Sequence, residues 1–296
     1  MPFDRPPPTP TPDLTAAARA GGTDERDPAL QDNTVAIMGL RLHDLHREVI
    51  AQRVIAAVRL RRKLLVVNAN AHLVVLSQRN PWIRALFLKA DIAFCDGAGV
   101  QLALRLLGGR RAHRTTPPEW IGAVLSALRS EASIFWIGGH PDVVAKAASR
   151  YEALYGVRTA GIQHGYFDMS ARSSEATSLL QRINQAAPSI LLVNMGMPRQ
   201  ERWVLENWDD LRTGVVITAG ALVDHAAGRV RRPPRWVANL GLEWLVRLVI
   251  EPRRLWRRYL LGLPVFGFYM LRYAAQAQNM KRVKKRAKLV ISQHES

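Results

Sequence analysis

Asparagine and aspartate residues stand at the ends of two apolar runs in this chain. Asn68 and Asn70 end the run LLVVNAN (64–70), and Asp96 follows ADIAFC and opens the turn DGAG (96–99). Glycines keep such a turn open to close ligand approach, so the carboxylate stays accessible. A carboxylate in this position can take a proton from an attacking hydroxyl group. Asp96 is therefore a candidate general base, although a turn-forming or helix-capping aspartate has the same spacing.

Five other positions could contact an anionic or polar ligand. Arg114 lies in a loop ahead of a predicted helix, where a solvated surface arginine is the alternative. Gly138 and Gly139 follow SIFWI and suit a phosphate-approach turn, although strand-to-helix turns use glycines generally. In GMPRQE (196–201), Gln200 offers both a donor and an acceptor to a base or sugar. Glu201 is either a ligand contact or a first-turn acid that favours the helix dipole.

Several known ligand signatures are absent. The chain has no GxxxxGK[ST] loop, no GxGxxG fingerprint and no Asp-x-Asp pair of the kind that holds a divalent ion against a diphosphate. His72 and His164 lack partners at metal-ligand spacing. The sequence therefore predicts no cofactor and no metal site, and it argues against P-loop enzymes and nucleotide-dependent oxidoreductases.

Alternating apolar runs and helical patterns must position these residues. The runs are unbroken rather than alternating, which is typical of strands buried on both faces of a parallel sheet. Strand–helix alternation over this length predicts an α/β fold with a mainly parallel Rossmann-like sheet, with binding groups at the carboxyl ends of the strands. Predicted strands are 34–39, 64–70, 90–97, 133–139, 157–163, 189–196 and 214–220; predicted helices are 45–61, 71–88, from 99, 118–129, 141–156 and 171–186.

Composition divides the chain into four parts. Residues 1–33 predict a disordered Pro-rich tail, 34–227 an α/β domain, 228–275 amphipathic helices and 276–296 a basic tail. The net charge is +18, and residues 229–288 hold 16 Lys or Arg against two Asp or Glu. Such a block predicts a polyanionic partner: nucleic acid, anionic lipid or a phosphorylated ligand.

The chain shows no secretory signal and no run long enough to span a bilayer. The longest late apolar stretch, 260–271, has 12 residues and contains Gly262, Pro264 and Gly267, whereas about 20 apolar residues are needed. Arginine alternating with Trp and Leu at helical spacing instead favours an interfacial, peripheral association with an anionic membrane surface. The single cysteine, Cys95, excludes an internal disulfide and fits a reducing compartment.

Seven segments together resemble the WecG/TagA/CpsF glycosyltransferases, also called glycosyltransferase family 26. The resemblance covers about Val35 to Tyr259, and its last segment is long and distinctive. In chain order the segments are NANAHL (68–73), ADIAFCDGAGV (90–100), GGHPDV (138–143), GYF (165–167), NMGMPRQERW (194–203), GALVDHAAGRVRRPPRW (220–236) and GLEWLVRLVIEPRRLWRRYL (241–260).

The resemblance implies a GT-E-like fold and an inverting, metal-independent transferase. Its members move a sugar from a UDP-sugar to a polyprenyl-diphosphate-linked sugar during cell-envelope or exopolysaccharide synthesis, as peripheral proteins on the cytoplasmic face of the bacterial inner membrane. The family's base corresponds to Asp96, its loop arginine to Arg114 and its glutamine to Gln200. Its T-x-N motif near the donor corresponds to 68–70, where Asn70 matches and Asn68 replaces the threonine, so the resemblance implies that both asparagines bind substrate.

The C-terminal helices of the family are thought to cover the active site and engage the membrane. Arginines that face inward there would stabilise the departing diphosphate in place of a metal. The candidates are Arg232, Arg247, Arg254 and Arg257, and for each a lipid-facing or solvated charge is the alternative.

The chain departs from the family where V-T-G-x-D becomes TTPPE (115–119), which places Pro117 and Glu119 at the glycine and aspartate positions. This change bears on the choice of sugar more than on reaction type. The alternative function is a basic nucleic-acid-binding protein with an α/β core. Because the basic block alternates with Trp and Leu, we expect a membrane rather than nucleic acid as partner. The sequence is also compatible with a homo-oligomer.

Overall fold

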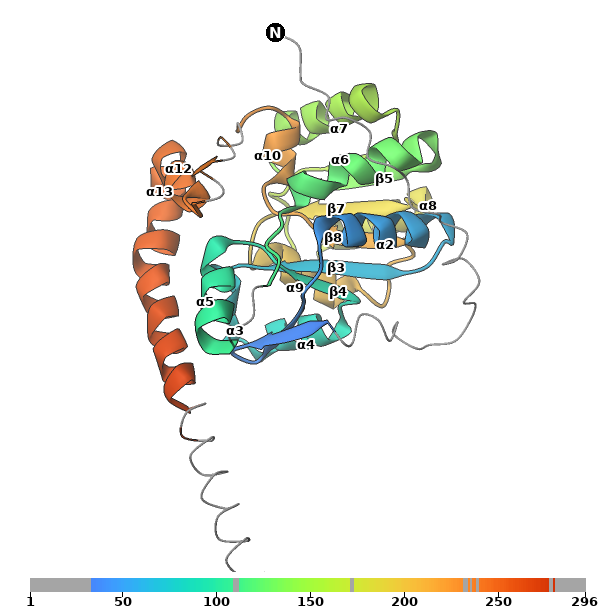
Figure 1. The fold of residues 1–296 in the computed structure, drawn as a ribbon. Coiled ribbons are helices and arrows are strands. Elements are labelled where there is room, and N and C mark those ends of the chain that lie inside the picture. Colours follow the sequence, from blue (N-terminus) through green and yellow to red (C-terminus); the bar gives the residue numbers. More distant parts are fainter. Residues whose placement is uncertain are drawn as a thin grey trace, which may run out of the picture.

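The computed structural model describes residues 33–108, 112–170, 173–230, 234, 236–237, 240–276 and 279. They form an α/β fold in which helices cover both faces of an eight-stranded sheet (Figure 1). The strand order is β1-β2-β4-β3-β8-β7-β5-β6. Every pairing is parallel except that of β1 with β2. The predicted fold class is confirmed.

The strands agree closely with the predicted apolar runs. They are β1 (Thr34–Ile37), β2 (Leu40–His43), β3 (Leu64–Ala69), β4 (Ile92–Cys95), β5 (Ser133–Gly138), β6 (Arg158–Gln163), β7 (Ile190–Asn194) and β8 (Val215–Thr218). All residues of β4, β5, β7 and β8 are buried, as expected for central strands covered on both faces.

Two sets of helices pack on opposite faces of the sheet. One face carries α2 (Arg47–Arg59), α6 (Pro117–Leu128), α7 (Pro141–Tyr155) and α10 (Leu222–Ala226). The other carries α3 (Ala71–Ser77), α4 (Pro81–Lys89), α5 (Ala98–Gly108), α8 (Ser174–Ala186) and α9 (Arg199–Asn207). Each face has its own hydrophobic core, and the central strands are enclosed between them, whereas the edge strand β6 is only partly covered.

The structure corrects two of the predicted elements. The strand predicted at 34–39 ends at Ile37, and Met38 and Gly39 turn the chain back into β2 with positive φ angles of 46° and 85°. Two consecutive residues of this kind are typical of a tight hairpin. The helix predicted over 71–88 is split into α3 and α4, because Pro81 lacks the backbone N–H that a continuous helix needs.

The C-terminal residues form an appendage that lies against the α/β domain. It comprises α12 (Glu243–Ile250), α13 (Pro252–Trp256), a π-helical turn η3 (Arg257–Leu261) and a helix over 262–276. The last helix runs beside α5 (Figure 1), and Phe266 is buried there near Gly99. Arg79 of the α/β domain donates to the Tyr269 hydroxyl at 3.4 Å. None of the described helices is both long and apolar enough to cross a bilayer. The predicted 1–33 tail and 276–296 tail fall almost wholly outside the described residues, and the limits of the four parts stay predictions.

Candidate active site

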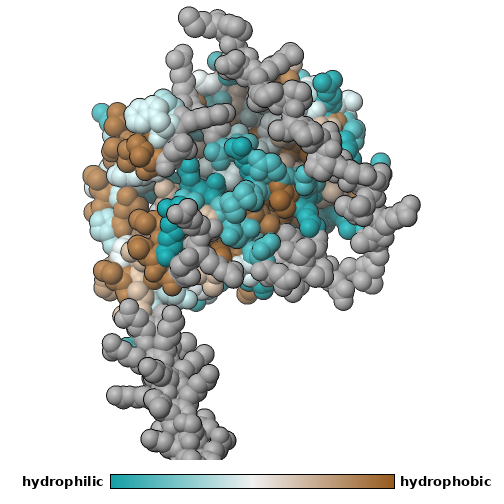
Figure 2. Space-filling view, in the orientation of Figure 1, coloured by the Kyte–Doolittle hydropathy of each residue, from teal (hydrophilic) through white to brown (hydrophobic). Residues whose placement is uncertain are grey.

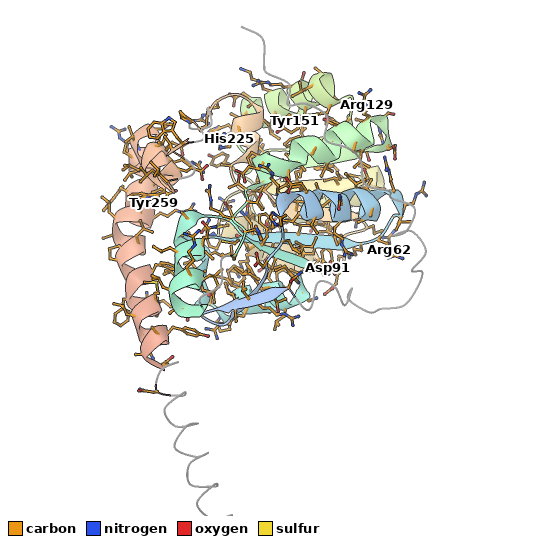
Figure 3. All side chains as sticks on the ribbon, viewed as in Figure 1. Arg62, Asp91, Arg129, Tyr151, His225 and Tyr259 are labelled. Atoms are coloured by element: carbon orange, nitrogen blue, oxygen red, sulfur yellow. The ribbon has the colours of Figure 1, made fainter. Side chains whose placement is uncertain are left out.

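The parallel strands bring the predicted site residues to one edge of the sheet. Because β3, β4, β5, β7 and β8 run in the same direction, the segments that follow them share that edge. Helices α7 and α9 leave the neighbouring strands β5 and β7 on opposite faces. Such a topological switch point is where open α/β sheets bind ligands. Asp91 lies at the other end of β4 and accepts a hydrogen bond from the Leu65 backbone N–H at 2.7 Å. Figure 3 shows it on the side of the sheet away from Tyr259 of the appendage.

Asp96 follows β4 directly, and its carboxyl group is set among protein atoms. Its backbone N–H donates to the Ala69 carbonyl at 2.8 Å, which holds the start of the turn after β4 against the end of β3. Burial raises the pKa of Asp96 to about 6, although a hydrogen bond from Asn68 and the charge of Arg258 oppose that rise. A carboxyl group with this pKa is ionised at neutral pH and is a stronger base than an exposed aspartate.

The side chains of the two predicted asparagines form hydrogen bonds with other groups of the protein. Asn68 is 2% exposed and donates from Nδ2 to Oδ2 of Asp96, and its Oδ1 accepts from the Thr218 hydroxyl at 3.1 Å. Asn70 caps α3, because its Oδ1 accepts from the Leu73 backbone N–H at 3.1 Å. Asn68 thus orients the carboxylate of Asp96, and Asn70 shapes the turn beside it.

The backbone of Arg114 is held beside the residue that precedes Asp96. Arg114 forms a parallel β-bridge with Cys95, and the Thr115 N–H donates to the Cys95 carbonyl at 3.0 Å. The guanidinium donates from Nη1 to Oε2 of Glu243 at 2.6 Å. Arg114 is therefore not a solvated surface residue: its side chain is 12% exposed and contacts the appendage.

Close backbone packing accounts for the two glycines after β5. A Cβ at Gly138 would lie 2.3 Å from the Asn194 carbonyl oxygen, and φ of Gly138 is 128°. Gly139 also has a positive φ, 69°, and its N–H and carbonyl face the loop at Gly165, where the Gly165 N–H donates to the Gly139 carbonyl at 2.8 Å. Strand packing thus requires Gly138, and the backbone conformation favours glycine at Gly139, whether or not a phosphate approaches them.

Gln200 and Glu201 are fully buried at the start of α9. Gln200 Oε1 accepts from the backbone N–H groups of Gly196 (3.2 Å) and Gly220 (3.1 Å), and its Nε2 donates to Glu201 Oε1 at 2.7 Å. Gln200 therefore joins the turns after β7 and β8. Glu201 Oε2 has no hydrogen-bond partner, and burial raises the pKa of Glu201 to about 7.

The structure adds a residue that the sequence analysis did not single out, Arg258. It belongs to the π-helical turn η3, a geometry that is frequent at functional sites. Burial lowers its pKa, while Asp96 and Glu201 lie close enough to raise it. Its Nε is buried without a hydrogen-bond partner. Arg258 is three residues beyond Leu255 and eight before Phe266, both buried; this helical spacing is the sequence signal that could have identified an inward-facing arginine.

Two of the four predicted arginines have described side chains, Arg247 and Arg257, and both have partners within the appendage. Arg247 pairs with Glu251 of the same helix at 3.8 Å, and Arg257 is exposed over the ring of Trp256 at 5.3 Å. Arg232 and the side chain of Arg254 lie outside the described residues. Of the described arginines of the appendage, Arg258 is the one whose charge lowers the pKa of both Asp96 and Glu201.

The remaining polar groups near the edge have structural explanations. His72 is held neutral, because burial and the charge of Arg258 lower its pKa to about 4. Glu119, which departs from the family pattern, caps α6 by accepting from the Thr116 N–H at 2.8 Å. In the described part of the chain, no three His, Cys, Asp or Glu side chains meet as a metal site.

The site thus combines a carboxyl group of raised pKa with two shielded arginines at the edge of the sheet where open α/β folds bind ligands. This combination suits proton removal from a hydroxyl group opposite a departing anion. The model of the Glycosyl transferase WecG/TagA/CpsF family matches residues 35–280, which include the sheet except for Thr34 and the appendage through residue 276. The chain therefore belongs to the WecG/TagA/CpsF family of glycosyltransferases.

Proposed function

We propose that this glycosyltransferase moves a sugar from a UDP-sugar to a polyprenyl-diphosphate-linked sugar, with inversion at the anomeric carbon. The observation that carries the proposal is the placement of Asp96, whose pKa of about 6 suits a base, near the partly buried cation Arg258. The family implies sugar transfer, and these residues supply the two chemical requirements of a single displacement.

In the proposed reaction Asp96 accepts the proton of the acceptor hydroxyl. The hydroxyl oxygen forms a bond to the anomeric carbon as the bond from that carbon to the β-phosphate oxygen breaks. The electron pair of that bond leaves with UDP, so negative charge builds up on the phosphate oxygens of UDP. Because attack and departure occur on opposite sides of the carbon, one displacement inverts its configuration.

Arg258 and Arg114 are proposed to receive that charge. Both guanidinium groups are shielded from solvent, where a charge-assisted hydrogen bond to a phosphate oxygen is stronger than at the surface. The unpartnered Nε of Arg258 is a donor that a bound anion would satisfy. Gln200 and Asn68 are proposed to hold the surrounding turns and the base rather than to bind the sugar, since their amide groups already bond within the protein.

We also propose that the appendage associates with an anionic membrane surface on the cytoplasmic face of the bacterial inner membrane. Large apolar side chains are exposed along it: Val249, Ile250, Trp256, Leu260, Leu261, Phe268 and Leu271. Figure 2 shows hydrophobic residues gathered on the side of the molecule that carries this helix. Exposed arginines among them, such as Arg257, would meet anionic headgroups, each worth about 1 kcal/mol near the surface.

A panel of UDP-sugars assayed with short-chain polyprenyl-diphosphate sugars tests the reaction. We expect one donor to be consumed with acceptor extension and an inverted linkage, and we expect EDTA to leave the rate largely unchanged. No transfer with any pair would contradict the proposed substrates, and loss of activity in EDTA would reveal a metal requirement. Liposome flotation beside DNA retention at matched salt separates a membrane surface from nucleic acid as the partner of the basic region.

A further inference from the structure

Glu243 opens α12 and joins the appendage to the α/β domain. Its Oε2 accepts a hydrogen bond from Nη1 of Arg114 at 2.6 Å, and the two side chains are 24% and 12% exposed. An ion pair with this geometry and shielding is stronger than a surface pair, whose contribution is about 0–1 kcal/mol. The contact spans 129 residues of sequence.

The partner of Glu243 is held rigidly at its backbone. Arg114 bridges to Cys95, and Thr115 donates to the Cys95 carbonyl, so the segment moves with the end of β4. The guanidinium lies at the end of a long, flexible side chain. Because Glu243 holds one end of it, this carboxylate helps to determine where the cation lies relative to Asp96.

Glu243 also acts on Asp96 through charge. The groups that act on the Asp96 carboxyl come from four elements: Asn68 of β3, Arg114 of the segment before α6, Glu243 of α12 and Arg258 of η3. Burial is the largest influence and raises the pKa of Asp96; Asn68, Arg258 and Arg114 lower it, and Glu243 raises it. Among the named side chains, Glu243 therefore makes Asp96 a stronger base.

We propose that Glu243 is a positioning residue for transfer, which places Arg114 for the donor diphosphate and links it to the seating of the appendage. The inference rests on the proposed function of Asp96 and Arg114. It assigns a second carboxylate to the site, one supplied by the appendage that neither touches the acceptor nor receives its proton.

Replacement by Gln tests this role, because Glu243→Gln keeps the shape and removes the charge. We expect kcat/KM to fall about ten-fold or more, as for loss of a shielded charged hydrogen bond. The acid limb of the pH profile should move to lower pH, because the carboxylate that repels ionised Asp96 is gone. Glu243→Asp keeps the charge and should retain the acid limb. Glu131→Gln is the matched control: it breaks the Arg59–Glu131 pair (3.1 Å), which lies before β5 and is exposed, and should change neither value.

Calorimetry with UDP separates two roles of Glu243, because they predict opposite changes in UDP affinity. A positioning carboxylate predicts weaker UDP binding in Glu243→Gln, because Arg114 loses its orientation. A carboxylate that merely occupies Arg114 until an anion arrives predicts tighter binding. Tighter or unchanged UDP affinity, or an unmoved acid limb in a folded variant, would overturn the proposal.

Hydrogen exchange over residues 243–250 tests the pair without any sugar. We expect faster exchange in Glu243→Gln and in Arg114→Glu, and recovery in the charge-exchanged double variant Arg114→Glu/Glu243→Arg, whose transfer activity should stay low. No recovery overturns the link to the appendage. If the unaltered protein neither binds UDP nor transfers sugar, the proposed function fails, and the exchange of the double variant still decides whether the pair seats the appendage.

Discussion

Asn68 donates a hydrogen bond from Nδ2 to Oδ2 of Asp96, between the neighbouring parallel strands β3 and β4. The Thr218 hydroxyl of β8 donates to Oδ1 of the same amide at 3.1 Å, which sets the direction in which the amide points. Side chains of the two neighbouring strands β3 and β8 therefore orient the carboxylate of the proposed base. The bond also stabilises the ionised form of Asp96 and lowers its pKa against the effect of burial.

Replacing Asp96 by Asn should leave the fold intact and lower transfer by at least about 100-fold, because the proposed base is removed. Steady-state assays with the accepted UDP-sugar measure the loss, and circular dichroism checks folding. Asp209→Asn is the control, since Asp209 is exposed and pairs with Lys89 at 2.8 Å. Near-normal turnover of Asp96→Asn would remove Asp96 from the mechanism.

The pH profile of kcat/KM should have an acid limb near pH 6. Because burial raises the pKa of Asp96 to about 6, the base is ionised above that pH and is lost as the pH falls through it. In Asn68→Ala the hydrogen bond that lowers this pKa is gone, so the limb should move to higher pH. A limb near pH 4 in the unaltered protein would assign it to a different, more exposed acid.

Glu201→Gln should stabilise the protein at pH 8 more than at pH 5. Burial raises the pKa of Glu201 from 4.5 to about 7, so the folded state binds more protons than the unfolded state between these values. Stability therefore falls as pH rises through that window, on the order of 2 kcal/mol for this one group. Thermal melts at both pH values, on variant and parent, give the difference. An equal change at the two pH values would mean that Glu201 stays ionised in the folded protein.

Arg258→Gln should reduce kcat/KM far more than Arg257→Gln, although the two arginines are adjacent. Arg258 is partly buried near Asp96 and Glu201, whereas Arg257 is exposed over Trp256. We expect a loss of about 10- to 100-fold for Arg258→Gln, typical of removing one donor to a developing negative charge. Its acid limb should also rise, because Arg258 lowers the pKa of Asp96. Equal losses for the two variants would point to the overall basicity of the helix instead.

The double variant Leu260→Ser/Leu271→Ser should weaken binding to anionic liposomes while leaving the fold unchanged. Leu260 is 58% and Leu271 67% exposed, so removing them lowers the apolar area available to the interface without opening the core. Leu154→Ser, at 62% exposed on α7, is the matched control. Flotation with and without anionic lipid provides the measurement, and unchanged flotation of the double variant would place the membrane contact elsewhere.

The local pattern of apolar residues predicted most strands of the sheet. It did not predict the hairpin between β1 and β2 or the helix break at Pro81. Unbroken apolar runs identified β3, β5, β7 and β8 to within about two residues, because strands buried on both faces leave no alternation. β2 has only four residues and alternates, so it gave no comparable signal, and its pairing depends on the turn at Met38 and Gly39. The break between α3 and α4 follows from Pro81, which the apolar periodicity did not take into account.

The sequence by itself predicted that Asp96 and the Gln200–Glu201 pair follow strands of one parallel sheet, and it predicted the family that the family model confirms. Parallel strands bring their carboxyl ends together, so order along the chain was enough for that step. Only the tertiary structure decided what each side chain does there. Asn68, Gln200 and Glu119 are occupied by internal hydrogen bonds, whereas Arg258 and Glu243 approach the base from more than 140 residues away in the sequence. Contacts of that range depend on how the appendage packs across the domain, and neither periodicity nor spacing carries that information.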